Sequence, residues 1–192
     1  MVARTSIRTL VAAAAMILPL LATAPTATAA PAGQAPTPRA PITITYDASR
    51  APEYYDAITR AIAIWNEHLE NVQIDEADPG DDAEVTFVAD PGWPRAELGP
   101  AMPGEHLTVW MGKEAVDQGH HVVRIAAHEF GHSLGLPDMK PGPCSSLMSG
   151  STAGVDCTNA VPNAEEIALV EENYASAAQR RYADKGKILV DR

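Results

Sequence analysis

Residues 128–138 read His-Glu-Phe-Gly-His-Ser-Leu-Gly-Leu-Pro-Asp, and this stretch decides the fold and the chemistry that we expect. His128 and His132 are four residues apart, so on a helix both imidazoles project from one face, one turn apart. Two imidazoles at that spacing can hold one zinc ion, and Glu129 beside them can act as a general base. An apolar stripe at helical spacing predicts the helix over 122–134.

A tetrahedral zinc site needs a third protein ligand. Gly135 tolerates the left-handed conformation that turns a chain sharply, so it can end the helix and bring Asp138 back to the metal as an oxygen ligand. A rival assignment puts the third ligand on the last helix, at Glu165 or Glu166, but Glu166 is better explained as solvated helix charge. The alternative without a metal is two buried histidines on a core helix and a surface Asp138.

The sequence on either side of this stretch predicts an α+β fold with a mixed sheet. Alternating β-rich residues indicate strands, and Ile58, Ile62 and Trp65 mark the buried face of a helix. Four prolines keep 90–104 from being a central strand and leave room for a short edge strand. The expected order is strand 42–46, helix 52–70, strands 72–74 and 84–88, the loop 90–104, strand 106–111, helix 122–134 and helix 163–182, with Asn163 as N-cap of the last.

The first 29 residues are typical of a secretory signal peptide. Arg4 and Arg8 precede an apolar run from Leu10 to Leu21, and Ala27-Thr28-Ala29 is a signal-peptidase site. The run is too short to span a membrane, and no later segment is apolar enough to do so. Residues 30–41 are rich in Pro and Ala and read as a short propeptide or linker, which leaves 42–192 as the zinc metallopeptidase domain.

The net charge of the chain indicates which classes of partner it can bind. The formal net charge is −11, and no acidic residue lies in the expected signal peptide. Such a chain repels phosphate backbones and anionic lipids, so we expect protein or peptide substrates and neither nucleic acid nor membrane as partner. Export puts Cys144 and Cys157 in an oxidising medium, where a single disulfide is the default.

The extended motif resembles that of the metzincin clan of zinc peptidases, and its Asp138 resembles the third ligand of the snapalysin family of small secreted bacterial neutral proteases. The likeness continues in Thr45-Tyr46-Asp47-Ala48-Ser49, in Gly142-Pro143-Cys144-Ser145-Ser146-Leu147-Met148-Ser149-Gly150 and in Cys157-Thr158-Asn159-Ala160. The resemblance implies a metzincin-like fold, in which a twisted mixed sheet carries a backing helix and an active-site helix. A small C-terminal subdomain then holds a methionine turn and the terminal helix.

The same resemblance implies roles for single residues. Met148 would lie in a tight turn beneath the zinc, and a Cys144–Cys157 disulfide would enclose that turn. The substrate would pair as a strand with an edge of the sheet.

Two departures from the family pattern bear on the site. Lys140 stands where relatives often carry Tyr; it could supply positive charge to the oxyanion or be solvated, and we expect the latter. Relatives that bind calcium use an Asp and a Thr where His121 and Val123 stand here, so calcium is possible by family but its usual ligands are not matched. His120 and His121 are expected to be exposed residues at a helix start rather than a second metal site.

These observations predict a secreted, extracellular, monomeric zinc-dependent endopeptidase with one catalytic zinc ion. The alternative is a catalytically impaired secreted binding module that retains the metzincin fold. The intact Glu129 favours the enzyme.

Overall fold

The structure is a computed structural model that describes residues 40–175 and 185–192. The expected signal peptide lies outside the described residues, as do most of the expected linker and the 176–182 part of the last helix. Within the described ranges, no helix has both the length and the apolar composition needed to cross a membrane.

Short strands and helices alternate along the described chain. Their order is β1 (Ile42–Arg50), a 3-10 turn (Pro52–Tyr54), α1 (Tyr55–His68), β2 (Val72–Glu76), β3 (Val85–Asp90), β4 (Arg95–Glu97), β5 (Leu107–Gly112), α2 (Lys113–Asp117), α3 (Val122–Ser133), a 3-10 segment (Leu147–Ala153), α4 (Ala164–Ala175) and β6 (Ile188–Val190).

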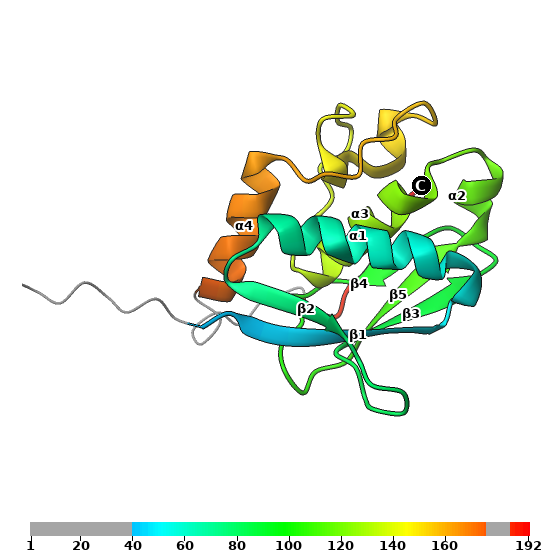
Figure 1. Ribbon diagram of the computed structural model, residues 1–192. Helices are drawn as coiled ribbons and strands as arrows, with labels where there is room; N and C mark the ends of the chain where they lie inside the picture. Colours follow the sequence, from blue (N-terminus) through cyan, green and yellow to red (C-terminus); the bar gives the residue numbers. More distant parts are fainter. Residues whose placement is uncertain (1–39, 176–184) are drawn as a thin grey trace, which may run out of the picture. The chain divides into compact units, whose positions relative to one another are not determined.

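The strands of the described ranges form one mixed sheet in the order β2-β1-β3-β5-β4-β6. In this sheet β2, β1, β3 and β5 are parallel to one another. β4 runs antiparallel to both β5 and β6. Two parallel neighbours need a crossover, which α1 supplies between β1 and β2. Figure 1 shows α1 lying across the sheet in front of α3.

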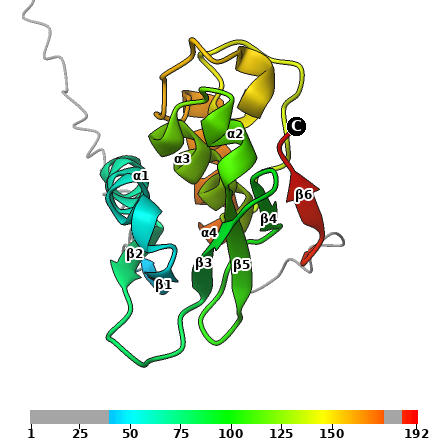
Figure 2. The same ribbon diagram turned by 90° about the vertical axis from the view of Figure 1, so that its right-hand side faces the viewer.

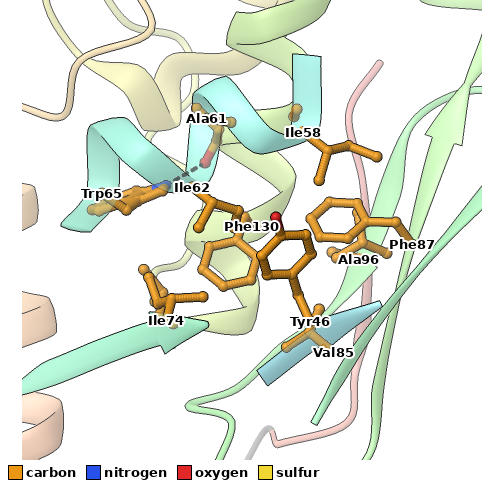
Figure 3. Close-up of a cluster of buried hydrophobic side chains, with 14 of the residues drawn as sticks. Tyr46, Ile58, Ala61, Ile62, Trp65, Ile74, Val85, Phe87, Ala96 and Phe130 are labelled. Atoms are coloured by element: carbon orange, nitrogen blue, oxygen red, sulfur yellow. Dashed lines mark hydrogen bonds between the residues drawn. The ribbon is translucent and has the colours of Figure 1, made fainter. Parts of the chain in front are cut away.

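The core between these helices and the sheet fixes α3 in place. Trp65 of α1 is fully buried and its Nε1–H donates to the carbonyl of Ala127 in α3, 3.0 Å away. Figure 3 shows Phe130 of α3 among the apolar side chains of α1 and the sheet, where it stacks on Phe87 with ring centroids 5.9 Å apart. Buried aromatic packing of this kind holds a helix rigidly, and this helix carries His128 and His132.

The observed elements match the expected α+β fold and extend it. The sheet, the backing helix α1, the helix α3 and the terminal helix α4 are all present, although β1 runs four residues beyond the expected strand end at Tyr46. The sequence did not predict α2, the 3-10 segment or β6. Each is at most seven residues long, too short for hydrophobic periodicity to reveal.

Candidate metal centre

His128 and His132 lie on one face of α3 with their Nε2 atoms 3.1 Å apart. The Nδ1 of His128 is 3.0 Å from the carbonyl oxygen of Leu147, and that of His132 is 2.7 Å from the carbonyl oxygen of Leu136. A carbonyl oxygen only accepts, so both Nδ1 atoms donate, and a neutral ring then presents its Nε2 lone pair to a metal. Such bonds orient imidazoles that bind a metal through Nε2.

The chain reverses at Gly135, as the sequence predicts. Gly135 has φ +94°, and its N–H donates to the carbonyl of His132 at 2.9 Å. A β-carbon at this glycine would come within 2.7 Å of Asn173 Nδ2 and 3.1 Å of the Pro100 ring. The position therefore requires glycine for its backbone conformation and for the space around it.

This reversal brings Asp138 to the two imidazoles. Its Oδ1 lies 3.5 Å from the Nε2 of His128 and 3.5 Å from the Nε2 of His132. Burial by itself would raise the pKa of Asp138, but the two imidazoles outweigh it and hold the pKa well below its usual range. The carboxylate is therefore ionised where a metal ligand must be.

Glu129 is fully buried beside the histidines, and neither of its carboxylate oxygens has a hydrogen-bond partner in the described part of the chain. Burial raises its pKa to about 8, while His128 and then Lys140 act in the opposite direction. A buried carboxyl without a partner is costly, and such groups occur where function requires them.

The donor set fits a divalent metal. Asp138 Oδ1 is a buried atom that faces both Nε2 nitrogens, with Lys140 Nζ 3.2 Å away as an ion-pair partner. The ligand atoms of His128, Glu129 and His132 also lie within 4.8 Å of one another, so Glu129 is a second candidate for the third position. Nitrogen and carboxylate oxygen in a compact group of three or four are what zinc prefers.

Met148 lies against the helix that carries the histidines. Its side chain is fully buried, and its sulfur would be 2.8 Å from a β-carbon placed at Gly131. The carbonyl of Met148 accepts from the N–H of Met139, so this turn also holds the segment next to Asp138. A Cys144–Cys157 disulfide encloses the turn.

Glu166 fixes this turn and does not face the metal cluster. It is 3% exposed and accepts from Ser146 Oγ at 2.7 Å and from the N–H groups of Leu147 and Met148 at 3.2 and 2.8 Å. The interpretation of Glu166 as solvated helix charge is therefore wrong, and its oxygens are already used, which argues against it as third ligand. Glu165, the other rival, is exposed.

The capping pattern of α4 was a signal that could have shown Glu166 to be hydrogen-bonded rather than solvated. Asn163 accepts from the N–H of Glu166 at 3.0 Å, and Glu166 accepts in return from the N–H of Asn163 at 2.7 Å. This reciprocal pair is a capping box, recognisable from the three-residue spacing. It confirms Asn163 as N-cap and holds the Glu166 carboxylate toward the methionine turn.

Arg124 holds the methionine turn from the other side, a role that the sequence did not indicate. It is 5% exposed and donates to the carbonyls of Ser146 and Asn159 and to Ser149 Oγ, the last at 2.9 Å. The guanidinium presents several donors in one plane, which suits a turn that exposes several carbonyls at once.

Lys140 is not solvated, contrary to expectation. Its side chain is 17% exposed, and its Nζ lies 3.2 Å from Asp138 Oδ1 and 2.6 Å from Asp191 Oδ1. Burial by itself would lower the pKa of Lys140, but the two carboxylates outweigh it and raise the pKa above its ordinary value. This pairing depends on Asp191, which the sequence analysis did not single out.

His120 and His121 are half-buried rather than exposed. His121 is the N-cap of α3, and its Nδ1 accepts from the N–H of Arg124 at 3.4 Å. The ring of His120 lies 6.4 Å from that of Trp93. Capping and packing account for both side chains.

Residues 41–177 match the model of the Streptomyces extracellular neutral proteinase (M7) family. The extracellular small neutral protease of Streptomyces coelicolor is 36% identical over 143 residues, 74% of this chain and 64% of that protein. The protein of the same name from Streptomyces caespitosus is 36% identical over 142 residues, 70% of this chain and 98% of that protein. The chain thus spans somewhat under two thirds of the length of the Streptomyces coelicolor relative.

Two solved structures resemble the fold more distantly. Archaemetzincin from Methanopyrus kandleri has a TM-score of 0.43 at 14% identity, covering 71% of this chain and 96% of that one. The hatching-enzyme zinc protease HCE-1 from Oryzias latipes has a TM-score of 0.37 at 19% identity, covering 51% of this chain and 46% of that one.

Proposed function

Because this chain belongs to the Streptomyces extracellular neutral proteinase (M7) family, we propose that it is a secreted zinc-dependent endopeptidase that hydrolyses peptide bonds in proteins. In this proposal His128, His132 and Asp138 hold one zinc ion, and Glu129 is the general base. The observation that carries it is the convergence of Asp138 Oδ1 on the two Nε2 atoms, 3.5 Å from each.

Glu129 supplies proton transfer. A zinc ion in this cluster would supply the Lewis acidity that makes water a nucleophile at neutral pH and polarises the scissile carbonyl. The Glu129 carboxylate accepts a proton from the attacking water and then delivers it to the leaving amine. Its burial and its lack of a partner among the described residues leave both oxygens available for this transfer.

Asp138 is preferred to Glu129 as third ligand because of its position and charge. Its Oδ1 is equidistant from the two nitrogens, and the imidazoles keep its pKa low, whereas burial raises the pKa of Glu129 to about 8. A ligand must be deprotonated to bind, and a proton carrier works best with a pKa near the operating pH. The two carboxyl groups therefore suit different roles.

Metal content and hydrolysis together test the proposal. The wild-type chain should bind one zinc ion per molecule by elemental analysis and should cleave casein, and a chelator should abolish cleavage until zinc is restored. Glu129→Ala should keep the metal but lose at least about a hundredfold in rate, the contribution of a general base. Asp138→Ala should weaken zinc binding about tenfold or more.

A matched control tests the rival assignment of the third ligand to Glu165. Glu165→Gln should bind zinc and cleave casein like wild type. Loss of metal in Glu165→Gln but not in Asp138→Ala would overturn the assignment of the third ligand. A chain that holds zinc but stays inactive both as wild type and with Asp191→Asn or Leu189→Pro, which release residues 185–192, would favour the secreted binding module instead.

A further inference from the structure

Residues 185–192 lie along the outer side of β4, beyond residue 177 where the family match ends. Figure 2 shows β6 beside β4 at this side of the sheet. The N–H of Leu98 donates to the carbonyl of Lys187 at 2.8 Å, and the N–H of Asp191 donates to the carbonyl of Pro94 at 3.0 Å. Without this segment, β4 would be an open edge of the sheet.

The segment is held by its backbone and by two charged side chains, Asp191 and Lys185, the second of which forms an ion pair with Glu105. Ile188 and Val190 are 49% and 41% exposed, so its apolar side chains contribute little to the core. Asp191 is the buried member of residues 185–192, at 4% exposure. A strand added to a sheet edge by main-chain hydrogen bonds, with a side chain in a pocket, is how proteins bind extended peptides.

The pocket that receives Asp191 is built for a carboxylate. Asp191 Oδ1 lies 2.6 Å from Lys140 Nζ and accepts from the N–H of Ser151 at 2.9 Å. A β-carbon at Gly150 would come within 2.3 Å of the same oxygen, so the absence of a side chain there leaves the space that the carboxylate fills. A half-buried ammonium and a backbone N–H that meet on one oxygen make strong, charge-assisted bonds.

This pocket borders the metal cluster. Lys140 Nζ also lies 3.2 Å from Asp138 Oδ1, and Asp191 and His128 line one small cavity. The other charged side chain of that cavity is Arg124, which the methionine turn binds. An occupant of the β4 edge therefore ends next to the residues that carry the chemistry.

We propose that the β4 edge, Lys140, Gly150 and Ser151 form a binding site for an extended peptide with an acidic side chain, and that residues 185–192 occupy it as a pseudosubstrate. The substrate class, an acidic extended peptide, rests on the proposed peptidase function, whereas the binding site itself does not. Residues 188–190 bury no apolar side chain, so displacing the occupant costs mainly its backbone hydrogen bonds and the ion pairs of Asp191 and Lys185. The segment then limits access to the site until it leaves.

A binding experiment tests the site without catalysis. The probe is a fluorescent hexapeptide with the sequence of residues 187–192, and its anisotropy is measured with the zinc-loaded 192-residue chain carrying Glu129→Ala. Adding Asp191→Asn to this chain should tighten probe binding about tenfold, because the neutral amide competes less well for the pocket. Leu189→Pro should do the same by removing a backbone donor from β6. Arg192→Ala, at an exposed position, should change nothing.

The carboxylate preference has its own readout. A probe with Asn in place of its Asp should bind about tenfold more weakly to the Asp191→Asn chain. Lys140→Met in that chain should bind both probes alike. The inference would be overturned if the Asp and Asn probes bound equally well to the Asp191→Asn chain that still has Lys140. It would also be overturned if the probe bound equally well to chains with and without Asp191→Asn.

A rate measurement connects the site to the activity. With Glu129 intact, Asp191→Asn and Leu189→Pro should each raise the rate of peptide cleavage about tenfold over wild type. If the chain shows zinc-dependent cleavage but Asp191→Asn and Leu189→Pro do not change probe binding, this inference is rejected and the peptidase proposal stands. If probe binding depends on Lys140 but no variant cleaves peptide, the proposed binding site stands and the peptidase proposal is rejected.

Discussion

At the scale of single residues, the proposed metal centre places two carboxyl groups in opposite electrostatic settings. Asp138 faces two imidazoles, which hold its pKa below the usual range, and burial raises the pKa of Glu129 to about 8. A ligand and a proton carrier need this difference, because one must stay ionised and the other must exchange a proton near neutral pH.

The raised pKa of Glu129 predicts how the stability of the metal-free protein depends on pH. Below pH 4.5 the carboxyl is protonated in both the folded and the unfolded chain. Between pH 4.5 and about 8 only the unfolded chain releases this proton, so the free energy of unfolding should fall as pH rises and should level off above about 8. Urea unfolding of wild type and Glu129→Gln at several pH values measures the effect.

The difference between these two proteins isolates Glu129, since other groups titrate in both. Glu129→Gln should become the more stable of the two as pH rises through this window. A stability difference that stays constant from pH 4 to pH 9 would contradict the assigned pKa.

At the scale of elements, the site depends on how α3 ends and on the turn that packs against it. Gly135 ends the helix and redirects the chain to Asp138, while Glu166 and Arg124 hold the methionine turn from opposite sides. None of these three residues is proposed to touch the metal. They set the geometry on which the ligands depend, so their substitution should change stability and zinc affinity together.

Gly135→Ala tests the helix end, with Gly119→Ala as matched control. Both glycines have φ +94°, but a β-carbon at Gly119 would meet nothing within 4 Å. We expect Gly119→Ala to cost about 1 kcal/mol for the backbone conformation alone. Gly135→Ala should cost about 2 kcal/mol more, because it also displaces Asn173 or Pro100.

Chemical denaturation gives both free energies of unfolding, and zinc titration supplies the second readout. Zinc affinity should fall in Gly135→Ala and stay unchanged in Gly119→Ala. Equal losses of stability in the two variants would show that the close approach to Asn173 and Pro100 has no energetic weight.

Glu166→Ala tests the methionine turn. The substitution leaves the N–H groups of Leu147, Met148 and Asn163 without their acceptor, and unsatisfied buried donors are costly. We expect a loss of about 3 kcal/mol in the free energy of unfolding. Glu165→Ala, one residue earlier and exposed, should stay within about 0.5 kcal/mol of wild type. Similar losses in both variants would mean that only general helix charge matters.

At the scale of the whole molecule, the family resemblance drawn from the sequence is confirmed by the match over residues 41–177 and by relatives at 36% identity. The expected α+β architecture and the Cys144–Cys157 disulfide are likewise present in the structure. The disulfide belongs to this scale because it ties the segment after the metal ligands to the segment before α4.

Removing the disulfide should destabilise the whole domain. Its cysteines are 13 residues apart, and closing a loop of that size contributes about 3 kcal/mol in the chain-entropy model. We expect Cys144→Ala/Cys157→Ala to lower the urea midpoint by the corresponding amount, measured with and without zinc. A midpoint equal to that of the oxidised wild type would contradict this assignment.

The sequence by itself determined the parts of this protein that are local. The spacing of His128 and His132, the glycine three residues later and Asp138 lie within 11 residues, so helix geometry and one backbone reversal bring them together. The buried face of α1 was equally readable, because a helix repeats its apolar positions at fixed spacing.

Only the tertiary structure decided the contacts between distant segments. Lys140 and Asp191 are 51 residues apart in the sequence, and Glu166 meets the methionine turn from 18 residues away. A charged residue in an isolated sequence looks solvated, because its partner and its burial arise only when remote elements pack. For the same reason the occupied edge of β4 became visible only once the fold had brought residues 185–192 to it.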